Sequence, residues 1–232
     1  GLGLQSAAGN MNVQIGRYGQ YYMCGACNIS LGQSTMQGTT TAADNIGHSN
    51  IALGKSAMYY EKTGCYNIAI GEGALYGDSA GVTGNENISI GRNAACSITS
   101  GANNVFLGKN AAAKHTTGGC NIFLGNYAGR GASSSGGTGH NNIAMGCNAL
   151  SEQLTSGCYN IALGDSAGIC IADGNYNINI GSCAGCKTTS GLRNISIGLK
   201  SGGQTTGGLT GRCNIFVGSY SGNLTTSGCN NI

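Results

Sequence analysis

A short motif recurs along the whole chain: an Asn, then an apolar residue, any residue, a second apolar residue and a Gly. Its Asn occurs thirteen times, and successive copies are 16 to 22 residues apart. Repeats of this length are typical of stacked supersecondary units, each of which buries its apolar side chains only against its neighbours. The marker residues are Asn12, Asn28, Asn50, Asn67, Asn87, Asn104, Asn121, Asn142, Asn160, Asn177, Asn194, Asn214 and Asn231.

Counted from the marker Asn as position 0, positions +1 and +3 are Ile, Leu, Val or Met in every complete copy, and position +4 is always Gly. Apolar residues at a period of two predict a short strand, with +1 and +3 in the interior and +2 pointing outward. The Gly is expected to permit a turn with positive φ, or a close approach of neighbouring backbone. Stacked marker Asn residues predict a ladder of side-chain amides.

A small residue, usually Ala, recurs at position +7, and a variable loop rich in Thr, Ser and Gly follows it. We interpret this as a second strand whose inward side chain is small because the interior is thin. The predicted fold is all-β, a parallel β-solenoid (β-roll) of about 13 short coils with NIxxG strands. We expect one repeat domain over residues 1–232, cut from a longer fibre protein. The alternative is a globular up-and-down β protein.

Composition excludes several classes of protein. Gly is 44 of 232 residues and Pro is absent, whereas collagen needs abundant Pro. Only 8% of residues are charged and the net charge is +3. The chain therefore lacks the charge repulsion of a disordered segment and the basic cluster of a nucleic-acid-binding protein. No stretch approaches the 18 continuous apolar residues that indicate a membrane span.

Position +2 carries no charge in any copy, whereas position +5 carries charged residues in six copies. An uncharged outward strip is a liability unless something covers it. We therefore expect other copies of the chain to cover this strip in a homotrimeric rod, with a single uncovered solenoid as the alternative. The predicted interchain face comprises Ala52, Ala69, Phe106, Phe123, Ala144, Ala162 and Phe216.

The pattern N-x-[VI]-A-I-G-x-x-[SA] resembles the head repeats of trimeric autotransporter adhesins, which implies a β-roll with three chains along one axis. The looser spacing, as in "NNIAMG…AL…TSG", resembles repeats of phage and giant-virus tail or surface fibres even more closely. The likeness covers essentially the whole chain. The adhesin repeats are shorter, near fourteen residues, and usually lack Cys, so the virion or another extracellular fibre remains open.

The twelve Cys residues argue for an oxidising compartment. The two CxxC pairs, Cys24/Cys27 and Cys183/Cys186, lie about nine coils apart, so they cannot share one metal ion. Cys170 and Cys186 fall near equivalent positions of adjacent coils and are the predicted disulfide. No metal site and no cofactor is expected.

Catalytic chemistry finds little support in the sequence. Of the eight acids, only Glu72, Asp78 and Glu86 cluster, and all eight are interpreted as solvated surface charges rather than a glycan-cleaving pair. His48, His115 and His140 lie in loops without a recurring Ser or Cys partner, so no catalytic triad is predicted. We expect that the chain is not an enzyme.

Four glycosylation sequons occur, at Asn28, Asn87, Asn194 and Asn223. The first three fall at the start of the repeat strand, where a glycan would not fit. Only Asn223 is a plausible acceptor, and only in a eukaryotic secretory setting.

The predicted function is structural, a stiff stalk of an extracellular or virion fibre that supports adhesion or host attachment. Its partners would be other copies of itself and, through the loops, a host-surface glycan or receptor, with no nucleic acid and no membrane span. Two alternatives remain: an ice- or surface-binding solenoid that uses Thr arrays, and a glycan-degrading tailspike.

Overall fold

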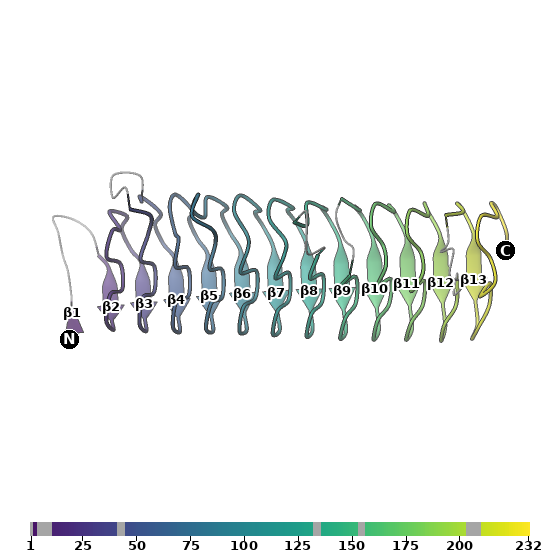
Figure 1. Ribbon diagram of the computed structural model, residues 1–232, viewed down its shortest axis with the longest axis horizontal. Helices are drawn as coiled ribbons and strands as arrows, with labels where there is room; N and C mark the ends of the chain where they lie inside the picture. The colour runs from purple at the N-terminus through teal and green to yellow at the C-terminus, as the bar shows by residue number, and fades with distance from the viewer. Residues whose placement is uncertain (1, 4–10, 41–44, 132–135, 153–155, 203–209) are drawn as a thin grey trace. The chain divides into compact units, whose positions relative to one another are not determined.

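The computed structural model describes residues 2–3, 11–40, 45–131, 136–152, 156–202 and 210–232. These residues form two compact units, Gly1–Gly118 and Gly119–Ile232, which we call unit 1 and unit 2. Within each unit the described residues form only strands and turns, and each coil contributes one strand (Figure 1). The prediction of an all-β solenoid with NIxxG strands is confirmed.

The strands of each unit follow one another in chain order. Parallel neighbours pair +1 with +1 and +3 with +3, as in Ile51 with Ile68 and Leu53 with Ile70. Unit 1 contains β1 (Leu2–Gly3), which is antiparallel to β2, then β2 (Val13–Ile15), β3 (Ile29–Leu31), β4 (Ile51–Leu53), β5 (Ile68–Ile70), β6 (Ile88–Ile90) and β7 (Val105–Leu107). Unit 2 contains β8 (Ile122–Leu124), β9 (Ile143–Met145), β10 (Ile161–Leu163), β11 (Ile178–Ile180), β12 (Ile195–Ile197) and β13 (Ile215–Val217).

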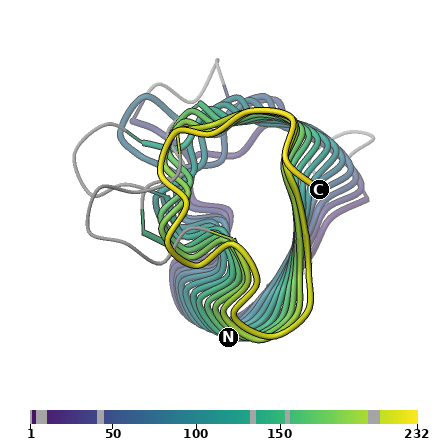
Figure 2. The same ribbon diagram turned by 90° about the vertical axis from the view of Figure 1, so that its right-hand side faces the viewer.

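The two faces of the strands are the reverse of the prediction. The +2 side chains fill the interior of each coil, which we call the lumen: Ala52, Phe106 and Phe123 are fully buried. The +1 and +3 side chains point outward, and none of them is buried. Seen end on, the coils of each unit share one outline, so equivalent side chains stack (Figure 2). The lumen is thus built from position +2 and from the turns, not from the Ile and Leu pairs.

The Gly at +4 shows both predicted features, a positive φ and a close approach of neighbouring backbone. Its φ lies between 118° and 139° in all twelve copies, a left-handed conformation that favours glycine. A Cβ at Gly54 would lie 2.8 Å from the backbone carbon of Gly71, and a Cβ at Gly71 equally close to Gly91. Neighbouring coils therefore contact each other backbone to backbone at this column.

The second strand predicted around position +7 is wrong, because this segment is a turn. The residues at +6 and +8 adopt positive φ in every copy, as in Ser56 (56°) and Met58 (51°), and such residues cannot continue an extended strand. Backbone hydrogen bonds still join adjacent turns, for example from the Met58 N–H to the Ala74 carbonyl (2.9 Å). Position +7 is buried in every copy except that of Ser221, as in Ala57 and Ala74, so the prediction of a small inward residue is confirmed for those copies.

The Asn ladder is confirmed and is bonded more fully than the sequence indicated. The Asn67 side-chain oxygen accepts the backbone N–H of Asn87 (2.9 Å), while its Nδ2 donates to the Gly84 carbonyl (2.8 Å). Gly84 belongs to a second glycine column, three residues before each marker Asn, which the sequence analysis missed. A Gly there in every copy was the available signal.

Side-chain size is complementary across the lumen. Where +2 is Ala, +8 is usually large: Ala52 is matched by Met58 and Ala69 by Leu75, all fully buried. Where +2 is Phe, +8 is Ala or Gly, and a Cβ added at Gly129 would overlap the Phe123 ring. Large and small residues thus share a fixed lumen volume, as close packing requires.

Candidate interaction surface

The outward +1 and +3 side chains form two columns of aliphatic residues on each unit. We call these columns the aliphatic face. Every one of these residues keeps part of its surface in water, and the exposed fraction is 45% at Leu31 and Leu107 and reaches 66% at Val217. In unit 1 the face comprises Val13, Ile15, Ile29, Leu31, Ile51, Leu53, Ile68, Ile70, Ile88, Ile90, Val105 and Leu107. In unit 2 it comprises Ile122, Leu124, Ile143, Met145, Ile161, Leu163, Ile178, Ile180, Ile195, Ile197, Ile215 and Val217.

The face predicted to lie between chains is wrong, because those side chains lie inside a single chain. Six of the seven are fully buried in the lumen and the seventh, Phe216, is 6% exposed. A side chain that is already enclosed has no surface to offer another chain. The residues of this wrongly predicted interchain face are Ala52, Ala69, Phe106, Phe123, Ala144, Ala162 and Phe216.

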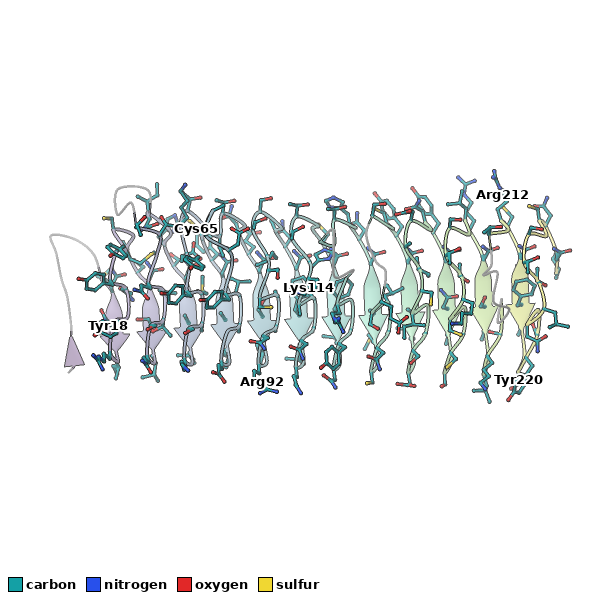
Figure 3. The ribbon with its side chains drawn as sticks, in the orientation of Figure 1. Tyr18, Cys65, Arg92, Lys114, Arg212 and Tyr220 are labelled. Atoms are coloured by element: carbon teal, nitrogen blue, oxygen red, sulfur yellow. The ribbon has the colours of Figure 1, made fainter. Side chains whose placement is uncertain are left out.

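A row of exposed residues at position +5 flanks the aliphatic face. In unit 1 this row contains four cations and one acid, and Lys55 Nζ lies 3.7 Å from Glu72 Oε1. In Figure 3, Arg92 of this row lies at the lower edge of the view and Cys65, in another coil of unit 1, at the upper edge. The ion pair between Lys55 and Glu72 is well exposed, so it contributes little to stability. The row comprises Arg17, Gln33, Lys55, Glu72, Arg92 and Lys109.

The disulfide predicted between Cys170 and Cys186 is not formed, and no two of the twelve cysteines, all of which lie in the described residues, are at bonding distance. The Sγ atom of Cys170 lies 3.9 Å from a carboxylate oxygen of Glu152 instead. Burial raises the pKa of the Cys170 thiol. It therefore favours the neutral thiol, the form that is poor in both metal binding and disulfide exchange.

No group of three or more His, Cys, Asp or Glu side chains that could hold a metal ion occurs among the described residues. The acids that cluster in sequence, Glu72, Asp78 and Glu86, are exposed, as the sequence indicated. Asp44 lies outside the described residues. His115 departs from the loop prediction, because it is fully buried in the lumen with its ring 6.1 Å from that of Phe106.

The sequence analysis treated Glu61 as a surface charge, which is wrong. Its side chain is fully buried, and neither carboxyl oxygen has a hydrogen-bond partner. Ile98 and Ile171, which occupy the equivalent sequence position in two other coils, are fully buried as well. Loss of hydration raises the pKa of Glu61 well above its usual value, and the nearby backbone N–H groups of Gly64 and Lys62 offset this only in part.

The raised pKa of Glu61 predicts a pH dependence of unit 1. The unfolded chain loses this proton near pH 4.5, whereas the folded chain retains it to higher pH. Stability should therefore fall as pH rises above that value, by up to about 1.4 kcal/mol per pH unit within the window. Denaturant unfolding between pH 4 and pH 9 measures this slope.

The variant Glu61→Gln is expected to match the wild type near pH 4 and to be more stable at pH 8. The exposed Glu86 supplies the control, because Glu86→Gln should leave the slope unchanged. An equal slope in the wild type and in Glu61→Gln would show that Glu61 is ionised in the folded chain without cost.

Aromatic side chains also stack between coils on the loop surface. The rings of Tyr59 and Tyr76 stack at 5.0 Å in unit 1, and those of Tyr159 and Tyr176 at 4.9 Å in unit 2. The sequence analysis did not select these residues, although Tyr159 and Tyr176 both directly precede a marker Asn. Stacking at this spacing follows from the register of the coils.

The described residues contain no helix that could cross a membrane. The comparisons with known proteins give no family to which the chain could be assigned: no family model matches it, and neither a curated protein nor a solved structure shows significant similarity. The repeat geometry and the aliphatic face are therefore the basis for any functional conclusion.

Proposed function

We propose that this chain is a structural segment of an extracellular or virion fibre, in which three copies pack side by side through their aliphatic faces. The observation that carries the proposal is the outward orientation of twenty-four aliphatic side chains in unbroken columns on the two units. The resemblance to trimeric fibre repeats agrees with it. The role is mechanical, and any contact with a host glycan or receptor would be made by the loops.

The size of the aliphatic face supports burial by another chain. Burying an aliphatic side chain is worth about 1.5–3 kcal/mol at about 25 cal/mol per Å², which corresponds to about 60–120 Å². With about a third exposed, the twelve side chains of one unit leave on the order of 250–500 Å² of apolar surface in water. Monomeric proteins rarely expose a contiguous apolar patch of more than a few hundred Å². A stable interface buries about 800 Å² per partner. The face of each unit thus supplies about a third to two thirds of that area.

The regularity of the aliphatic face favours copies of the same chain as its occupants. Its side chains repeat at the strand spacing of about 4.8 Å, so two such faces can pack in register over their whole length. An unrelated globular partner would seldom present a matching period. Closed rotational symmetry then buries every copy's face without leaving an open edge, and we retain three chains as the expected number.

The first test is the mass of the native assembly, measured by sedimentation over a range of protein concentrations with and without reductant. The wild type should be a trimer under both conditions, because no disulfide is required. In the variant Ile161→Lys/Leu163→Lys, two ammonium groups replace half-exposed aliphatic side chains at the middle of unit 2. The affinity between chains should fall at least 100-fold while each chain stays folded.

A matched variant controls for the added charge. Ser182 and Ser219 lie in the exposed +5 row of unit 2, so Ser182→Lys/Ser219→Lys adds the same two charges outside the aliphatic face. This variant should assemble as the wild type does. A monomeric wild type at high concentration, or equal assembly of the two variants, would contradict the proposal.

A further inference from the structure

Three of the four glycosylation sequons begin at rungs of the Asn ladder. Asn28, Asn87 and Asn194 are at most 1% exposed. Their Nδ2 atoms donate, at 2.8 to 2.9 Å, to the carbonyls of glycines in the next coil that lie three residues before its marker Asn. Their side-chain oxygens accept the backbone N–H of the following marker Asn, at 2.9 to 3.2 Å.

N-glycosylation uses the same nitrogen atom that the ladder uses. In the transfer, the asparagine Nδ2 bonds to C1 of a lipid diphosphate-linked oligosaccharide, the lipid diphosphate leaves, and one amide proton is released. The product carries a sugar ring on an atom that is enclosed by the lumen and packed against the next coil. An oligosaccharide cannot leave that position without separating the two coils.

Asn223 is in a different environment. It lies in a turn of the last coil, partly exposed, and its backbone N–H donates to the Tyr220 carbonyl (3.3 Å). The following Leu224 is 79% exposed, so the sequon projects into solvent. A glycan at this position would displace no hydrogen bond of the Asn ladder.

We propose that N-glycosylation of Asn28, Asn87 or Asn194 and formation of the solenoid are mutually exclusive, and that Asn223 is the sequon that accepts a glycan in the folded chain. Glycosylation acts on the extended chain as it is synthesised, so it precedes closure of the ladder. A chain that contains the three ladder sequons folds efficiently only where no oligosaccharide is transferred to Asn28, Asn87 or Asn194. The inference is independent of the proposed self-association, because the ladder lies inside one chain.

The repeat itself supplies the means of removing the three sequons without touching the ladder. The sequon Ser residues, Ser30, Ser89 and Ser196, occupy the lumenal +2 position, where four other coils have Ala. The Ser89 and Ser196 hydroxyls have no hydrogen-bond partner, and Ser30 only accepts one from Gln20 (3.1 Å). The variant Ser30→Ala/Ser89→Ala/Ser196→Ala should therefore fold at least as well as the wild type.

The experiment expresses the full chain behind a secretion signal in a eukaryotic line. Protease-resistant and protease-sensitive fractions are separated, and the occupied sites are mapped by peptide mass. Wild-type chains with a glycan at Asn28, Asn87 or Asn194 should appear only in the sensitive fraction. The triple Ala variant should be secreted in the resistant fraction with one glycan at Asn223, and the further change Thr225→Ala should remove that glycan.

Cytosolic bacterial expression of the same chains controls for folding, since both should be resistant there. A resistant wild-type fraction with a glycan at any of the three ladder positions would overturn the mutual exclusion. A triple variant whose resistant fraction never carries a glycan at Asn223 would overturn the assignment of that site.

Discussion

Asn67→Ala should lower the free energy of unfolding of the chain by about 2–6 kcal/mol. The substitution leaves the Asn87 N–H and the Gly84 carbonyl without the partners that Asn67 provides, both inside the lumen. Each buried, unpaired backbone group costs about 1–3 kcal/mol. A loss of this size is comparable with the whole stability of a small domain. Denaturant unfolding measures the loss.

A second readout localises the damage. Because each coil contacts only its neighbours, opening should concentrate around Asn87, whose amide hydrogen should exchange with solvent much faster than in the wild type. Gln33→Ala provides the control, because Gln33 is exposed and surface substitutions usually change stability by less than about 0.5 kcal/mol. A loss below about 1 kcal/mol with unchanged exchange at Asn87 would mean that water replaces the amide fully.

The features that sequence reasoning predicted correctly depend on the period of the repeat. A constant Asn, a constant Gly four residues later and two apolar residues between them indicate stacked coils whatever the side-chain directions are. The Asn ladder follows from the same register, because equivalent residues in stacked coils must meet. Such inferences need only the spacing of residue types, and spacing is what a sequence displays directly.

Predicting which face of each strand points into the lumen requires the volume of the lumen, and the period of the repeat does not contain that information. Ile68 and Ile70 alternate with Ala69 in the way that a buried pair alternates with an outward residue. The lumen, however, is too narrow for two branched side chains per strand, and it admits one +2 residue together with residues from the turn. The signal that could have shown this is the exchange of sizes between +2 and +8, as in Ala69 with Leu75 against Phe106 with Ala112.

The buried Glu61 and the unbonded Cys170 were missed for a different reason. Each lies where the loops vary in length. Counting forward from the Gly at +4 therefore assigns the residue to a coil, but it does not predict whether the side chain is buried. Glu61 lies three residues before the Gly that precedes its marker Asn by three, and the residues at the same position of two other coils, Ile98 and Ile171, are also fully buried. Counting back from the Gly that lies three residues before the marker Asn would have predicted that the Glu61 carboxyl is buried in the lumen. Cys170 and Cys186 belong to adjacent coils, but a disulfide also needs a specific separation and direction of the two side chains, and none is formed.

The exchange of sizes across the lumen predicts a compensating pair of substitutions in unit 2. Phe123→Ala alone removes a fully buried ring and should cost about 3–5 kcal/mol. Gly129→Leu alone should cost about 1–3 kcal/mol or more, because its side chain would overlap the Phe123 ring. The backbone itself accepts Leu at this position, since Leu75 and Leu150 adopt the same left-handed φ, at 50° and 51°.

The double variant Phe123→Ala/Gly129→Leu recreates the Ala and Leu pair that Ala144 and Leu150 form in the next coil of unit 2. It should therefore be more stable than the sum of the two single losses predicts, by about 2–3 kcal/mol, as contacting residues that share one volume are coupled. Denaturant unfolding of the four proteins gives this coupling directly. The reverse exchange in unit 1, Ala69→Phe/Leu75→Gly, should be coupled with the same sign. Strict additivity in both cycles would mean that the lumen adjusts each coil independently, and that the observed matching of sizes carries no energy.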